Sequence, residues 1–166
     1  MQGSLWRPAY VGVGSNLDDP AAQVERAFAA LAAIRETRLV LRSALYATAP
    51  FGPVAQPDFI NAVAGLLTLL SPESLLDDLR AIEAAQGRVR SGERWGPRRI
   101  DLDLLTVGGE TRRTPDLTLP HPGIPQRNFV LYPLSEIAPD LVVPGVGTVR
   151  NLKERVPVTG IRRLGP

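Results

Sequence analysis

The sequence predicts an α+β fold of the ferredoxin-like kind, a βαββαβ sandwich with helices packed on one face of an antiparallel sheet. Up to residue 107, apolar segments follow one another in the order strand, helix, strand, strand, helix, strand. Each helical segment opens with a capping residue and a proline. The length of 166 residues, without an internal repeat or a long linker, predicts a single domain over residues 1–166.

The first three elements are a strand, a helix and a second strand. Tyr10 to Gly14 is a short apolar strand. Asp19 is the predicted N-cap of a helix with Pro20 at its first position. Its apolar positions, Val24, Phe28, Leu31 and Ile34, have helical spacing. Arg38 to Tyr46 is the predicted second strand, and the loop APFGPVAQP follows it.

A strand, a helix and a last strand complete the predicted sandwich. The strand runs from Phe59 to about Leu70, and Ser71 then caps a helix that starts with Pro72 and stops at Gly87. The inner face of that helix carries Leu75, Leu79 and Ile82. An arginine-rich loop leads to the strand Arg99 to Val107. From about Gly108, we expect an appended hairpin, the loop LPHPGIPQRNF and a short helix near Pro133 to Ile137.

The composition is that of a soluble globular protein, with 44% hydrophobic and 22% charged residues. No apolar run approaches the roughly 20 residues of a membrane span, so we expect no membrane partner. The opening MQGSLWRPAY lacks the pattern of a signal peptide, and the chain has no cysteine. We therefore expect a cytoplasmic protein, and we expect it to be a monomer.

Two aspartates, Asp101 and Asp103, interrupt the apolar run that ends in IDLDLL. Because side chains alternate along a strand, both carboxylates are predicted on one face, roughly 6 to 7 Å apart. Like charges at that distance repel unless water, arginines or a cation compensate them. Mg²⁺ prefers such oxygen ligands together with water and phosphate oxygens, so the pair is a candidate metal site. Solvated aspartates paired with arginines are the alternative.

Arginines crowd the loop in front of these aspartates: Arg88, Arg90, Arg94, Arg98 and Arg99. The planar guanidinium binds phosphate through two hydrogen bonds. Cations that hold phosphoryl oxygens and metals that bridge them are what phosphoryl transfer needs most. Together, the loop and the aspartates favour a phosphate and metal site over a merely solvated basic loop.

Several other kinds of site are disfavoured. His121 is the only histidine and there is no cysteine, so we do not expect a zinc site. A phosphate contact shared with Arg127 is the functional interpretation of His121, and a structural hydrogen bond is the alternative. The chain contains no G-x-x-x-x-G-K-[ST] motif, and GVGSNL lacks the third glycine of a dinucleotide-binding fingerprint.

A flat ring is the predicted ligand of a second group of residues. Phe59 and Asn61 lie two residues apart on one face of a predicted strand, and Phe51 lies in the preceding loop. An aromatic face beside an amide can stack on a heterocycle and hydrogen-bond its edge. Core packing is the alternative for any phenylalanine.

These segments together resemble the 6-hydroxymethyl-7,8-dihydropterin pyrophosphokinase family of folate biosynthesis. The matching stretches, in family order, are YVGVGSNL, SALYATAPFGP to QPDFINAV, GRVRSGERWGPRRIDLDLL, LPHP with the arginine that follows, and FVLYPLSEIAP. They cover nearly the whole chain, and the run from Gly87 to Asp103 is the most specific. The resemblance implies transfer of a pyrophosphoryl group from ATP to the pterin hydroxymethyl oxygen, leaving AMP.

The resemblance also implies residue roles. Asp101 and Asp103 match ligands of two Mg²⁺ ions. Arg88 and Arg98 match catalytic loop arginines, Arg90 and Trp95 match loop positions that support closure over ATP, and His121 and Arg127 match ATP phosphate contacts. On the pterin side, Asn61 matches the amide that reads the ring edge, Phe59 and Phe129 match stacking rings, and Thr48 to Phe51 match a hydrogen-bonding backbone segment.

The chain departs from the family at a few positions: Phe59 replaces a frequent tyrosine, Pro122 and Pro125 stiffen the His121 loop, and Asp116 stands where a basic or neutral residue is expected. Two alternative functions remain at this point. An RNA-binding module fits the sequence pI of about 9.5, but its aromatic strand motif is missing and we expect no nucleic-acid partner. A D-x-D nucleotidyl or glycosyl transferase would release pyrophosphate or a nucleoside diphosphate instead of AMP.

Overall fold

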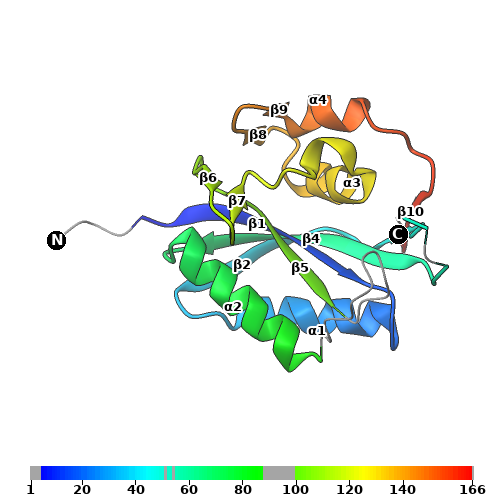
Figure 1. The fold of residues 1–166 in the computed structure, drawn as a ribbon, viewed down its shortest axis with the longest axis horizontal. Coiled ribbons are helices and arrows are strands. Elements are labelled where there is room, and N and C mark those ends of the chain that lie inside the picture. The colour runs from blue at the N-terminus through cyan, green and yellow to red at the C-terminus, as the bar shows by residue number, and fades with distance from the viewer. Residues whose placement is uncertain (1–4, 51, 54, 88–99, 166) are drawn as a thin grey trace.

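The computed structural model describes residues 5–50, 52, 53, 55–87 and 100–165, and Figure 1 shows its fold. The strands are β1 (Arg7–Ser15), β2 (Thr37–Arg42), β3 (Tyr46–Thr48), β4 (Phe59–Thr68), β5 (Asp101–Val107), β6 (Arg112–Arg113), β7 (Thr118–Leu119), β8 (Val142–Val143), β9 (Gly147–Thr148) and β10 (Ile161–Arg163). The helices are α1 (Pro20–Ala32), α2 (Pro72–Ala85), α3 (Asn128–Ile137) and α4 (Val149–Glu154), with a 3-10 turn at Ile124–Gln126.

The main sheet has the strand order β10-β3-β4-β1-β5, and β2 also pairs with β4. All pairings in this sheet are antiparallel. The unit β1-α1-β2 leaves a gap that β4 fills, and the unit β4-α2-β5 leaves a gap that β1 fills. Two interleaved βαβ units of this kind form the ferredoxin-like sandwich, which confirms the predicted fold class.

Helices α1 and α2 cover one face of the sheet, as predicted (Figure 1). Asp19 caps α1 by accepting a hydrogen bond from Ala22 N at 3.5 Å, and Ser71 caps α2 by accepting one from Ser74 N at 3.1 Å. Both helices have proline in the first turn. The predicted inner positions are in the core beneath them: Val24, Phe28, Leu31, Ile34, Leu75 and Leu79. The stop at Gly87 is also confirmed, because its φ of 85° is left-handed.

The opposite face of the sheet is also covered by helices. The sequence predicted helices on one face only. Helices α3 and α4 lie there (Figure 1) and form a second core with the sheet. Strand β4 supplies both cores: Val63 belongs to the second, whereas Ala62 and Ala64 belong to the first. A strand that is apolar on both faces must be covered on both, so the chain after β5 supplies the second layer.

The predicted strand from Arg38 to Tyr46 is divided in the structure into β2 and β3. Ser43 lies at the break, where its backbone N–H still donates to Val63 O at 2.9 Å. The Ser43 hydroxyl, instead of a backbone carbonyl, accepts the bond from Val63 N at 2.9 Å. A side chain therefore replaces one backbone group of the ladder, and the strand is interrupted there.

The C-terminal part contains more structure than the predicted hairpin and short helix. The hairpin is present as β6 and β7, but α3 begins at Asn128, five residues before the predicted start at Pro133. Pro133 lies inside the helix, and the buried side chains Val130, Leu131 and Leu134 hold both sides of it against the sheet. The hairpin β8-β9, helix α4 and strand β10, which pairs with β3, were not predicted.

In the part of the chain that the structure describes, no helix is both long and apolar enough to span a bilayer.

Candidate active site

The two aspartates lie on β5, beside two glycines of β1. Asp101 pairs in register with Gly14, and Asp103 pairs with Gly12. Their side chains share one face of the sheet because they are two residues apart on a regular strand. Both residues are half-buried. This confirms the predicted strand from Asp101 to Val107, whereas Arg99 lies outside the described residues. It also places both carboxylates at an edge that water or a ligand can reach.

Asn61 lies on the other side of the same glycine strand. Strand β4 pairs Asn61 with Gly14, so one row across the sheet reads Asp101, Gly14, Asn61. Neighbouring strands are about 4.8 Å apart, which puts the backbones of Asp101 and Asn61 roughly 10 Å from each other. The row thus has a carboxylate at one end, an amide at the other, and no side chain between them.

The amide of Asn61 is held in place by Thr48. Asn61 Nδ2 donates a hydrogen bond to Thr48 Oγ1 at 2.7 Å, and both residues are buried. Thr48 lies on β3 and pairs in register with Phe59, the first residue of β4. The structure therefore brings Thr48, Phe59 and Asn61 together, and it shows a side-chain contact of Thr48 that the sequence analysis did not identify.

His121 lies in the loop after β7, close to the aspartates. Its backbone N–H donates to Leu105 O at 2.9 Å, which ties the loop to β5. Its Nδ1 accepts a hydrogen bond from Gly123 N at 2.9 Å. The pKa of His121 is lowered to about 4, first by burial and then by the Arg127 charge, while the Asp101 charge acts in the opposite direction. His121 is therefore neutral at pH 7, with Nε2 as the nitrogen that carries the proton.

Arg127 immediately precedes α3 and turns its guanidinium toward β5. Its Nη1 lies 4.0 Å from Asp103 Oδ2, and both side chains are about one-third exposed. The guanidinium carbon lies 5.6 Å from the centre of the Phe129 ring. Phe129 itself is half-buried against the second core. His121, Arg127 and the aspartates thus surround one edge of the sheet face, and Phe129 lies beside Arg127.

Five other predicted site residues lie outside the residues that the structure describes: Phe51, Arg88, Arg90, Trp95 and Arg98. Among the described residues there is no group of three or more histidine, cysteine, aspartate or glutamate side chains that could enclose a metal ion. A pair of carboxylates suits Mg²⁺ nevertheless, because that ion keeps several waters and takes substrate phosphates as further ligands. The donor set of Asp101 and Asp103 fits that ion.

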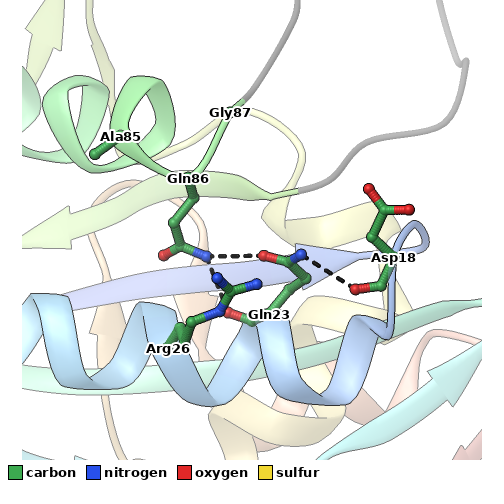
Figure 2. A pocket seen from close by; sticks show the side chains of 6 residues that line it. All are labelled: Asp18, Gln23, Arg26, Ala85, Gln86 and Gly87. Atoms are coloured by element: carbon green, nitrogen blue, oxygen red, sulfur yellow. Dashed lines mark hydrogen bonds between the residues drawn. The ribbon is translucent and has the colours of Figure 1, made fainter.

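A separate hollow of about 400 Å³ lies between the start of α1 and the end of α2 (Figure 2). Asp18, Gln23, Arg26, Ala85, Gln86 and Gly87 line it. Gln86 Nε2 donates to both Gln23 O and Gln23 Oε1 at 3.2 Å, and Gln23 Nε2 donates to Asp18 O at 3.1 Å. None of the predicted site residues that the structure describes lines this hollow, and the bonds between Gln86 and Gln23 join the end of α2 to α1.

The model of one protein family, 7,8-dihydro-6-hydroxymethylpterin-pyrophosphokinase (HPPK), matches residues 10–139. A 2-amino-4-hydroxy-6-hydroxymethyldihydropteridine pyrophosphokinase of Pseudomonas aeruginosa is 48% identical over 155 residues, which are 93% of this chain and 95% of that one. Proteins of the same name from Haemophilus influenzae and Methylorubrum extorquens are 44% and 47% identical, over 95% and 94% of this chain and 98% of each relative.

Solved structures show the same fold. The wild-type HPPK-DHPS of Plasmodium falciparum with pteroate matches 93% of this chain with a TM-score of 0.73 and 15% identity. The same protein with pterin and p-hydroxybenzoate matches with a TM-score of 0.71 and 15% identity, again over 93% of this chain. This chain spans 43% and 44% of those longer chains, so the likeness concerns one part of them.

Proposed function

This chain belongs to the 7,8-dihydro-6-hydroxymethylpterin-pyrophosphokinase family, and from this membership we infer its reaction. It transfers pyrophosphate from ATP to the hydroxymethyl group of 6-hydroxymethyl-7,8-dihydropterin, a step of folate biosynthesis. It is an ATP-dependent diphosphotransferase that binds a nucleotide and a pterin. The observation that carries the residue assignment is the row Asp101, Gly14, Asn61. At one end of this row a carboxylate can hold a metal ion beside the phosphates, and at the other end an amide can hydrogen-bond the edge of the pterin ring.

We propose that the hydroxymethyl oxygen of the pterin attacks the β-phosphorus of ATP. The bond from the β-phosphorus to the oxygen that bridges it to the α-phosphorus breaks, AMP leaves with that oxygen, and the β- and γ-phosphoryl groups stay together on the pterin. Negative charge grows on the oxygens around the β-phosphorus, which is where cationic groups accelerate the reaction most. The alcohol needs orientation more than a strong base, and Asp101 or Asp103 can accept its proton.

Asp101 and Asp103 are the proposed ligands of two Mg²⁺ ions. Mg²⁺ held by these carboxylates would neutralise part of the triphosphate charge and orient its oxygens. Arg127 lies beside Asp103, and the backbone of His121 is hydrogen-bonded to β5, the strand of both aspartates. Both residues are therefore proposed phosphate contacts. Arg88 and Arg98 are proposed as the arginines that engage the transferring group, with Arg90 and Trp95 supporting them. These four assignments rest on the family resemblance.

The proposed pterin site lies at the Asn61 end of the row. The Asn61 amide reads the ring edge, and Phe59 and Phe129 stack on the ring. The Thr48 hydroxyl orients the amide through the bond at 2.7 Å. Phe51, with the backbone of residues 48–51, is the remaining proposed contact.

We also propose that the protein acts as a monomer, which sedimentation at assay concentration can test.

Product analysis is the direct test of the reaction. The protein is incubated with ATP, Mg²⁺ and 6-hydroxymethyl-7,8-dihydropterin, and the nucleotides are resolved. AMP formed in equal amount with pterin pyrophosphate is the expected result. ADP, or free pyrophosphate, would contradict the proposal.

The metal assignment is tested by Asp101→Asn and Asp103→Asn. Each change removes a charge but keeps the shape of the side chain, so we expect turnover to fall by at least about 100-fold while pterin affinity changes little. Full Mg²⁺-dependent turnover in both variants would overturn the assignment.

A further inference from the structure

The position of a Cβ atom on Gly14 is filled by another residue. A methyl carbon built on Gly14 would lie 2.5 Å from Oδ1 of Asn61 and 3.6 Å from its Cγ. Non-bonded atoms in good contact are about 3.5 to 4.0 Å apart, so the two groups cannot share this space. The Asn61 amide thus occupies the volume that any other residue at position 14 would need.

Backbone conformation does not account for this glycine. Gly14 lies in the extended strand β1 and pairs with β4 on one side and β5 on the other. Extended backbone is open to every residue type, and glycine weakens a strand interior because it packs nothing. Close approach of another group is the remaining physical reason for glycine at this position.

Gly12 provides a comparison on the same strand and face. A methyl carbon built on Gly12 would have its nearest neighbours, Asp103 Cβ and Leu105 Cδ2, at 3.8 Å, which is ordinary contact. Strand β1 therefore has room for a side chain at position 12 and none at position 14.

We propose that Gly14 is a positioning residue for the pterin: its missing side chain holds open the space in which the Asn61 amide must lie to read the ring. This inference rests on the proposed pterin contact of Asn61. The amide has little freedom to move elsewhere. Asn61 is 9% exposed and Thr48 is 3% exposed, and the bond of 2.7 Å between them is buried. A methyl group at position 14 must turn the amide away from Thr48, from the ring edge, or from both.

The test compares Gly14→Ala with the unchanged protein. The dissociation constant of 6-hydroxymethyl-7,8-dihydropterin is measured in the presence of Mg²⁺ and a non-hydrolysable ATP analogue. The dissociation constant of the ATP analogue is measured separately, without the pterin. We expect the dissociation constant of the pterin to rise about 10- to 100-fold, because one or two hydrogen bonds to the ring are lost. The dissociation constant of the nucleotide analogue should stay within about twofold, because Asn61 lies at the opposite end of the row from Asp101, the proposed phosphate side.

Gly12→Ala is the matched control, since it adds the same methyl group on the same face of β1. Its pterin constant should also stay within about twofold. An equal loss of pterin affinity in Gly12→Ala and Gly14→Ala would overturn the proposal, because the effect would then belong to strand β1 in general.

A double variant tests whether Gly14 acts through Asn61. Once Asn61→Ala has removed the amide, adding Gly14→Ala should weaken pterin binding no further. If Gly14→Ala alone does not fold, the double variant should fold again, because the contact of 2.5 Å has gone. Additive effects of the two changes would contradict the proposal.

Asn61→Ala alone separates this inference from the function on which it rests. If Asn61→Ala leaves the dissociation constant of the pterin unchanged, the assignment of Asn61 as a pterin contact is wrong. If Asn61→Ala weakens binding but Gly14→Ala does not, the contact stands and the inference about Gly14 is wrong.

Discussion

His121 is the single histidine of the chain, so its ionisation can be followed without assignment of others. Burial is the largest cause that lowers its pKa to about 4. Its Nδ1 accepts a bond from Gly123 N, so the neutral ring with the proton on Nε2 is the form that the loop stabilises. A neutral Nε2–H can donate to a phosphate oxygen without first gaining a charge.

We expect the Cε1–H resonance of His121 in the free protein to show no titration near pH 6.5 and to shift only near pH 4. Because the folded pKa is depressed, the stabilising contribution of the neutral ring is complete above pH 6.5 and is lost as the pH falls toward 4. Proton NMR over this pH range measures the pKa of His121. A midpoint near 6.5 would contradict the lowered pKa and its cause, the partial burial of the ring.

The proposed site shows which residues a sequence can and cannot identify. Asp101, Asp103 and Asn61 were predictable, because charged or amide groups inside apolar strands are unusual and alternation fixes their face. The role of the Thr48 side chain was not, since it depends on the register between β3 and β4. Gly14 gave no signal by itself, because a glycine that makes room for a neighbour looks like any other glycine.

Helix α3 carries Phe129 and is tied to β3 by the side chain of Glu136. Glu136 Oε1 accepts a hydrogen bond from the Tyr46 hydroxyl at 2.7 Å, and Glu136 Oε2 accepts one from Ala44 N at 3.0 Å. Arg163 of β10 lies 3.6 Å from the same carboxylate. Burial and the bond to Glu136 raise the pKa of Tyr46 to about 12. This contact holds the second layer against the strand that bears Thr48.

Tyr46→Phe should lower the free energy of unfolding by about 1 to 3 kcal/mol at pH 7, since it removes a bond to a charged acceptor. The unfolded tyrosine loses its proton near pH 10 and the folded one near 12. Between these values the unfolded state binds fewer protons, so the wild-type protein should lose about 2 to 3 kcal/mol of stability that Tyr46→Phe does not lose. Urea unfolding at pH 7 and at alkaline pH measures both effects.

Glu136→Gln is the companion variant, because an amide can keep only one of the two bonds that the carboxylate accepts. We expect it to be destabilised as well, with a weaker alkaline loss than the wild-type protein. If Tyr46→Phe and wild type lose stability in parallel above pH 10, Tyr46 is not the group that titrates.

The element boundaries show where local pattern is sufficient and where tertiary contacts decide. Helices α1 and α2 were predictable because capping residue, proline and apolar spacing agree. The break between β2 and β3 depends on one hydroxyl, that of Ser43, which meets Val63 from another strand. Helix α3 is longer than predicted, because a proline is typical of the first turn of a helix whereas packing on the sheet keeps α3 continuous through Pro133.

At the scale of the whole molecule, one sheet supports two cores. Leu79 of α2 is fully buried in the first core, and Leu131 of α3 is fully buried in the second. Adjacent residues of β4 belong to different cores, so neither core can lose its packing without exposing the strand that the other needs. The proposed site lies on the face of the second core, beside α3, and therefore depends on the stability of both cores.

We expect Leu79→Ala and Leu131→Ala each to lower the free energy of unfolding by about 2 to 5 kcal/mol, the range for a buried leucine. Because the cores share the sheet, each variant should still unfold in one transition, coincident by far-ultraviolet circular dichroism and by tryptophan fluorescence. Leu5→Ala is the control: Leu5 is 78% exposed, so its effect should stay within about 0.5 kcal/mol. A separate early transition in Leu131→Ala would mean that the layer of α3 and α4 unfolds alone. Arg127 and Phe129 would then leave the proposed site before the aspartates do.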